Sequence, residues 1–143
     1  MTDNLPEVVS AFKAWQARMD KAAQLAANNI GREVWTRAKN ITHEVTHNPK
    51  EPHRNAPLGG PNYVTGNLNR NIIQAPTVRV GFGTYITSVN SNAEYSRALE
   101  DGSPRWTSGV KYPFMKPARD EVVMTGLARA VLIGYVRAAM TGA

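Results

Sequence analysis

The residues best suited to chemistry lie in one short segment, which carries all three histidines of the chain. The run His43-Glu44-Val45-Thr46-His47 matches the pattern H-E-x-x-H. On a helix its two histidines lie one turn apart and can share a zinc ion, while the glutamate between them activates a bound water. His53 follows as a third nitrogen ligand. The pattern therefore offers His43, His47 and His53 as the metal site of a zinc metalloprotease.

The surroundings of this segment argue against a protease. Metzincins, the zinc proteases with this histidine spacing, have a glycine where this chain has Lys50, because the chain must turn sharply there. They also build a sheet before the active-site helix, whereas the residues before His43 have a helical pattern. Histidine and lysine suit the negative end of a helix without any metal. We therefore expect no catalytic residue, no metal and no cofactor, and keep the zinc protease as the alternative.

Composition narrows the remaining classes of function. The chain has 143 residues and no cysteine, which excludes disulfides, thiolate metal sites and cysteine nucleophiles. Neither a P-loop nor a nucleophile elbow occurs. The net charge of +6 favours an acidic protein or nucleic acid as partner, but the basic residues are scattered. A basic nucleic-acid-binding module is thus a second alternative. The most apolar stretch, residues 122–140, contains two arginines, so we expect no membrane contact.

A long helix must position the histidine segment. Asn4 is a suitable N-cap, and Glu7 stands three residues later, as in a capping box. Apolar residues then recur at steps of three and four from Val8 to Val45, which predicts a helix over residues 5–46. Gly31 is a point where this helix could kink or divide. A small domain cannot cover so long an apolar stripe, so we expect part of the helix to meet another subunit.

The middle of the chain favours loops and short strands. Residues 47–63 contain four prolines, which exclude a regular helix and a central strand and predict an extended loop. Residues 64–112 predict a small antiparallel sheet with short helices. These comprise a helical turn over 65–73, strands over 77–82 and 84–89 joined at Gly83, a short helix after Ser91, and an irregular stretch or third strand over 103–112.

A second long helix is predicted over residues 117–140. Pro117 suits its first turn, and acidic residues follow where the helix dipole favours them. Leu127, Val131 and Tyr135 belong to an apolar face that is wide for a helix packed on one sheet, which indicates a second contact. The chain is thus predicted as a single domain over residues 1–143. Its fold class is α+β, with long N-terminal and C-terminal helices packed on a small antiparallel sheet and a proline-rich loop.

Three short pieces carry a resemblance to a known family. Tyr95-Ser96-Arg97-Ala98-Leu99-Glu100-Asp101-Gly102 is similar to a tyrosine–alanine … glutamate–x–glycine signature. Tyr112-Pro113-Phe114-Met115-Lys116-Pro117-Ala118 is similar to a proline–phenylalanine … proline–alanine signature. Thr65-Gly66-Asn67-Leu68 matches a threonine–glycine–x–leucine element. Together, and in the order in which they occur along the chain, they resemble the neck, or tail-completion, proteins of long-tailed bacteriophages. Ser96 departs from the family's alanine.

The resemblance implies a structural virion protein at the head–tail junction, assembled in the host cytoplasm. Its partners would be further copies of itself in a ring and the head-closure and tail-terminator proteins, with a passing contact to viral DNA. No reaction is implied. Phe114, held between two prolines, is expected to be a buried anchor. The expected determinants of fold or interface are Gly66, Leu68, Tyr95, Glu100, Gly102, Phe114, Pro117 and Val131.

Overall fold

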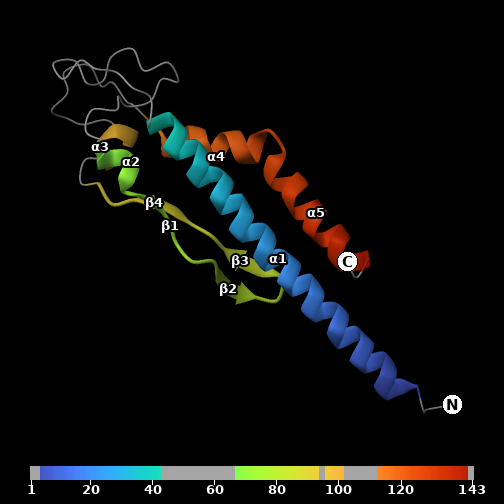
Figure 1. Cartoon of the computed structure of the whole chain (residues 1–143). Coiled ribbons are helices and arrows are strands. Elements are labelled where there is room, and N and C mark those ends of the chain that lie inside the picture. Colours follow the sequence, from blue (N-terminus) through green and yellow to red (C-terminus); the bar gives the residue numbers. More distant parts are fainter. Residues whose placement is uncertain (1–3, 43–66, 94–95, 102–112, 142–143) are drawn as a thin grey trace, which may run out of the picture.

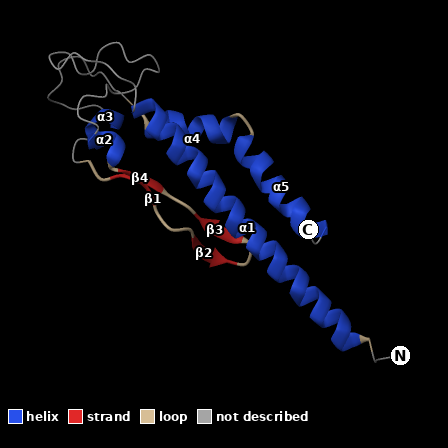
Figure 2. Ribbon diagram, in the orientation of Figure 1, coloured by secondary structure: helices blue, strands red, loops and turns tan. Residues whose placement is uncertain are grey.

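Three layers make up the fold. The computed structural model describes residues 4–42, 67–93, 96–101 and 113–141. Helix α1 (Leu5–Thr42) runs through the middle of the molecule, as Figure 1 shows. Four short strands lie along one side of it, and helices α4 (Met115–Met124) and α5 (Leu127–Thr141) lie along the other (Figure 2). The predicted α+β class is confirmed. The C-terminal helices, however, pack chiefly on α1.

Helix α1 forms because its apolar stripe is continuous, and Gly31 does not interrupt it. Gly31 is buried where the strands cross the helix. A Cβ atom there would collide with Thr87 Oγ1 and lie 2.7 Å from Gln74 Nε2. The glycine therefore lets the strands approach the helix closely, instead of kinking it. The described part of the helix ends at Thr42, and residues 43–46 of the predicted helix lie outside the described residues.

The strands form one long, interrupted hairpin. Its base pairs β1 (Ile72–Gln74) with β4 (Val89–Ser91), and its outer part pairs β2 (Val78–Gly81) with β3 (Thr84–Ile86), all antiparallel. The two parts are separated at Pro76, which has no N–H to donate. The turn at Gly83 is confirmed. The strand predicted over residues 84–89 is confirmed for residues 84–86, which pair with β2, but Val89 belongs to β4 and pairs with Gln74 at the base of the hairpin.

Two short helices flank the base of this hairpin. Helix α2 (Asn67–Arg70) is followed directly by β1, so the helical turn predicted over residues 65–73 is too long. The Trp35 indole N–H donates a 3.0 Å hydrogen bond to the Ile72 carbonyl and holds this residue beside α1. Helix α3 (Ser96–Asp101) follows β4 and agrees with the predicted short helix. The stretch 103–112 and the loop 47–63 lie outside the described residues.

The single C-terminal helix predicted over residues 117–140 is wrong. The chain becomes helical at Met115, leaves the helix after Met124 and resumes it at Leu127. Gly126 lies in the break with φ of 82°, a conformation that ends a helix and suits glycine. The two helices meet at a bend of 53°. No single helix among the described residues is long and apolar enough to cross a membrane; α4 and α5 reach that length and composition only as this bent pair.

The hydrophobic core lies at the C-terminal end of α1. Its buried side chains come from α1, α2, β1, α4 and the residues just after β4 and just before α4, and they are Ala38, Ile41, Leu68, Ile72, Ala93, Phe114 and Ala118. Asn69 closes this end of the helix, because its side-chain amide donates to the Lys39 carbonyl at 2.7 Å and to Thr42 Oγ1 at 2.9 Å. At the opposite, N-terminal end of α1, no described residue provides such a cover.

Candidate functional site

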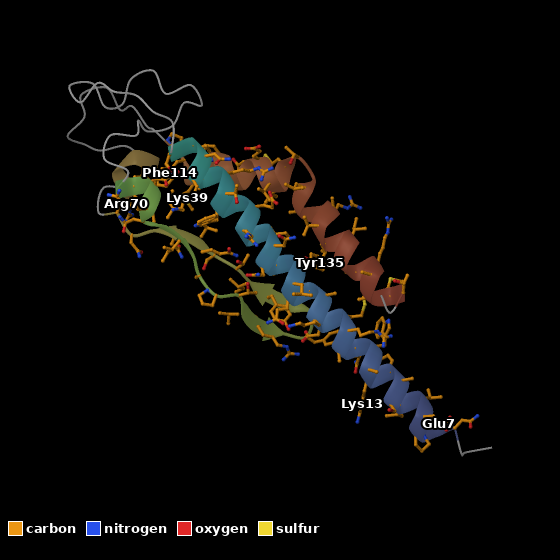
Figure 3. The ribbon with its side chains drawn as sticks, viewed as in Figure 1. Glu7, Lys13, Lys39, Arg70, Phe114 and Tyr135 are labelled. Carbon is orange, nitrogen blue, oxygen red and sulfur yellow. The ribbon has the colours of Figure 1, made fainter. Side chains whose placement is uncertain are left out.

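The N-terminal end of α1, residues 5–16, projects beyond the rest of the described molecule (Figure 1). The last hydrogen bonds that α1 makes to other described elements in this direction are close together. Arg18 Nε donates to the Ala139 carbonyl near the end of α5 at 3.3 Å, and Asp20 accepts from the hairpin turn. At a rise of 1.5 Å per residue, the projecting segment is roughly 18 Å long. Figure 3 shows Glu7 and Lys13 on this bare part of the helix.

The projecting segment carries an apolar stripe that the described molecule leaves largely exposed, down to 39 % exposure at Trp15. Leu5, Val8 and Phe12 are 65 %, 60 % and 55 % exposed. Trp15 is the fourth member of the stripe, and its ring stacks on Phe12 with centroids 5.8 Å apart. The spacing of three and four residues places these side chains on one face of the helix. Such a contiguous apolar face on a surface typically marks a contact with another protein.

The outer half of the hairpin presents a second uncovered face. Val78 and Val80 of β2 and Ile86 of β3 are between 56 % and 60 % exposed. Val78 lies opposite Ile86, so the side chains share one face of the ribbon. The residues between them, Arg79 and Tyr85, lie opposite each other and point toward α1 instead. The alternation that normally buries apolar side chains is therefore inverted here.

Asp20 of α1 explains this inversion. Its Oδ1 accepts from the Gly83 N–H at 2.8 Å, and its Oδ2 accepts from the Tyr85 hydroxyl at 2.7 Å and from Arg79 Nε at 3.2 Å. The Gly83 N–H, followed by the Tyr85 hydroxyl, lowers the pKa of the Asp20 carboxyl, while partial burial opposes the shift. The hydrogen bond between the Tyr85 hydroxyl and Asp20 also raises the pKa of Tyr85. An ionised Asp20 thus holds the polar face of the hairpin inward.

A groove between α1 and α5 lies next to the projecting segment. It encloses about 520 Å³ and is lined mostly by small apolar residues, with Arg18 and Lys21 as its basic groups. The remaining lining residues are Ala17, Ala22, Leu25, Tyr135, Ala138 and Ala139. At one end of the groove, the Tyr135 hydroxyl accepts a 3.3 Å hydrogen bond from the side-chain amide of Asn29. Figure 3 shows Tyr135 between the two helices. The groove is therefore a concave surface that could receive larger side chains.

Glu100 serves the fold on the opposite side of the molecule. Its Oε1 accepts the Phe114 N–H at 2.7 Å and also the Met115 N–H. These are the first free N–H groups of α4, so a carboxylate of α3 caps the start of a distant helix. The Lys116 N–H lies 3.5 Å from Oε2. Glu100 borders a hollow of about 520 Å³ between α1, the strands, α3 and α4, but its Oε1 is already engaged.

The structure gives different places to the residues singled out from the sequence. Leu68 and Phe114 are buried in the core, and Phe114 is fully buried, as expected. Pro117 lies in the first turn of α4 with its ring exposed, so it shapes the helix start without entering the core. Val131 is half-buried in α5, where no described residue is fully buried.

The remaining candidates lie outside the described residues. These are Gly66, Tyr95 and Gly102 of the family resemblance and His43, Glu44, His47 and His53 of the zinc alternative. Among the residues that the structure does describe, no group of three or more histidine, aspartate or glutamate side chains could hold a metal ion.

Sequence reasoning missed the Asp20 cluster and the role of Glu100 as a cap. Both join residues that are far apart in the chain, since Tyr85 follows Asp20 by 65 positions and Phe114 follows Glu100 by 14. The signal that the sequence offers for the Asp20 cluster is the alternation of Arg79 and Tyr85 with apolar residues, but this alternation alone does not tell which face of the strands turns inward. No known protein family, curated protein or solved structure matches the chain.

Proposed function

We propose that this chain is a structural subunit of the neck of a long-tailed bacteriophage, a ring subunit that joins the DNA-filled head to the tail. The observation that carries the proposal is the uncovered apolar stripe of the projecting segment, residues 5–16. Its side chains extend beyond the described fold, where no other described element covers them, so contact with another chain would remove them from water. The order of the three family-like pieces between two helical ends supports a neck protein in particular.

The polar clusters of the described residues support an assembly role as well. The Asp20 carboxylate is engaged by the hairpin, and Glu100 accepts backbone N–H groups of α4. Asp20 therefore orients the hairpin and Glu100 fixes the start of α4, so both carboxylates serve to hold elements of the fold in place. In this role the protein makes and breaks no covalent bond. It acts by complementary contacts with copies of itself and with head-closure and tail-terminator proteins, and its net positive charge suits an acidic neighbour or passing DNA.

The decisive experiment removes the protein from the virus that encodes it. Filled heads and free, unjoined tails in electron micrographs of the lysate are the expected result, and the wild-type chain supplied in trans should restore joining. Phe12→Glu should fail to restore it, because the charge prevents burial of the stripe. Ser10→Glu, on the opposite side of the same segment, is the matched control and should restore joining. Normal virions without the protein would overturn the proposal.

The zinc protease alternative makes a separate prediction. It rests on the match of His43, Glu44 and His47 to H-E-x-x-H, and it requires one zinc per chain and a peptidase activity that Glu44→Ala abolishes. Because Lys50 stands at the turn position, we expect elemental analysis of the purified protein to give no stoichiometric zinc. One zinc per chain together with that activity would replace the structural proposal with an enzymatic one.

A further inference from the structure

Two apolar surfaces of the described molecule have complementary shapes. One is a projecting stripe with large side chains, and the other is a groove lined largely by small ones. On the projecting segment, Phe12 is 55 % exposed and Trp15 is 39 % exposed, and their rings stack on each other. The groove between α1 and α5 is lined largely by alanines, which leave room for rings of this size. Packing of large side chains into spaces between small ones is how helices interlock.

The dimensions of the two surfaces agree. Val8 and Trp15 are separated by two turns of helix, which corresponds to about 10 Å. The α1 wall of the groove, from Ala17 to Leu25, also spans two turns, or about 12 Å. A short amphipathic helix lying in an apolar groove is a common mode of recognition between proteins.

One of the two charged residues of the projecting segment, Glu7, is complementary to the groove, and the other is Lys13. Glu7 is the only carboxylate of the described residues without a hydrogen bond or ion pair to another described group. It lies on the projecting segment, as Figure 3 shows. The groove carries Arg18 and Lys21 and no acidic residue. An acidic group on the helix would therefore meet basic groups on the groove.

Within one chain this contact is impossible. The projecting segment and the α1 wall of the groove are successive parts of the same helix, which is continuous from Leu5 to Thr42. Turning the segment back into the groove would break that helix and its hydrogen bonds. The segment can thus reach only the groove of another molecule.

We propose that residues 5–16 of one copy dock into the α1–α5 groove of the next copy, with Phe12 and Trp15 between the alanines and Glu7 beside Arg18 and Lys21. This contact joins different surfaces of identical chains, so repeated docking produces a ring when the rotation closes. The inference deepens the proposed function and rests on its claim that the chain forms a ring. It also leaves the apolar hairpin face of Val78, Val80 and Ile86 free for a different neighbour.

Single cysteines provide a direct test, because the natural chain has none and any disulfide between single-cysteine variants joins two molecules. Val8→Cys marks the apolar stripe, and Ala138→Cys marks the exposed rim of the groove. Mixed and oxidised, they should form the heterodimer at least about tenfold more than either forms homodimers, since a disulfide requires Cα atoms within about 7 Å. Circular dichroism confirms that each variant is folded.

Two matched variants make the test specific. Ser10→Cys lies on the side of the segment opposite the stripe and should cross-link poorly to Ala138→Cys. Val80→Cys marks the hairpin face and should cross-link poorly to Val8→Cys. Preferred Val8–Val8 disulfides would indicate a bundle of projecting segments, and preferred Val8–Val80 disulfides would indicate docking on the hairpin. Either result, or a protein that stays monomeric and uncross-linked, would overturn the proposed contact.

A charge exchange gives an independent readout. Glu7→Lys and Lys21→Glu should each weaken self-association in sedimentation velocity, and the double variant should recover it, because the attraction is restored with reversed signs. Lack of recovery would contradict the pairing. These measurements use the purified chain, so they are separate from head–tail joining in the virus. Docking without a joining defect would refute the neck function alone, and a joining defect without docking would refute this contact alone.

Discussion

The Tyr85 hydroxyl donates a 2.7 Å hydrogen bond to Asp20 Oδ2, and this bond links the outer half of the hairpin to the middle of α1. Because neighbouring side chains of a strand point to opposite faces, turning Tyr85 and Arg79 toward Asp20 turns Val78, Val80 and Ile86 outward. One carboxylate therefore determines which face of the hairpin is available to another protein.

Asp20→Asn should destabilise the protein at neutral pH. It should also make the stability depend less on pH in the acid range. The pKa of Asp20 is lowered from an ordinary value of 3.8, so its ionised form is favoured in the folded state. The stabilisation is present above that ordinary pKa and is lost as pH falls through the lower pKa of the folded protein. The melting temperatures of the wild type and the variant should thus differ at pH 7 and converge at an acid pH well below 3.8.

The control for this prediction is Tyr85→Phe. It removes one donor but keeps the Asp20 carboxylate and its bond from the Gly83 N–H, so it should retain part of the acid dependence. A difference in melting temperature that is the same at both pH values would show that the charge of Asp20 is not involved.

Glu100→Ala should lower the free energy of unfolding by about 0.5–2 kcal/mol, as loss of a helix cap does. The substitution leaves the N–H groups of Phe114 and Met115 without their acceptor. Glu100→Gln keeps an oxygen acceptor and should cost less than half as much. Urea unfolding can measure both. Asp101→Ala, at the exposed neighbouring position, should change the free energy by less than about 0.5 kcal/mol. Equal losses for Asp101→Ala and Glu100→Ala would refute the capping role.

Phe114→Ala should lower the free energy of unfolding by about 3–5 kcal/mol, because it leaves a cavity in the core. Phe114 is 0 % exposed and packs among side chains of α1, α2, β1 and α4. Met124→Ala is the control, since Met124 is 80 % exposed and its loss should cost less than about 0.5 kcal/mol. Similar costs for the two variants would contradict the position of Phe114 in the core.

Alanine at two glycines of the C-terminal helices should have opposite effects. Gly126 has φ of 82°, so Gly126→Ala forces a side chain into a strained conformation and should cost about 1 kcal/mol or more. Gly134 lies inside α5 with open space around it, so Gly134→Ala should stabilise by about 0.5–1 kcal/mol. Thermal unfolding decides between them. Stabilisation by both variants would mean that α4 and α5 form one straight helix.

The sequence predicted elements well where a single period persists over many residues. The stripe that begins at Val8 predicted α1 through Gly31, whose burial against Thr87 gives the glycine a packing role. The break at Gly126 was missed because Val123 and Leu127 lie one turn apart and conceal it. Strands β1 and β4 have three residues each, too few to establish an alternation.

The exposed apolar surfaces of α1 and of the hairpin were only partly predictable, because a sequence pattern shows periodicity but not contacts between distant residues. A stripe too long for a small domain indicated that part of α1 would meet another chain, and this follows from length alone. The outward turn of Val78 and Val80 could not be predicted, because it depends on Asp20, which lies 59 positions before Arg79. Contacts over such separations are set by tertiary packing and leave no periodic signal in the sequence.

The continuity of α1 also has a mechanical consequence. The helix has 38 residues and is therefore about 57 Å long, and its core contacts are concentrated at the C-terminal end. The helix behaves as a rigid rod that is held at the level of Arg18 and Asp20, with its N-terminal end extending beyond that point. The tip at Leu5 lies roughly 22 Å beyond Asp20, so a tilt of about 5° displaces it by about 2 Å. Small rotations of the body are thus amplified at the tip, without any bending of the helix.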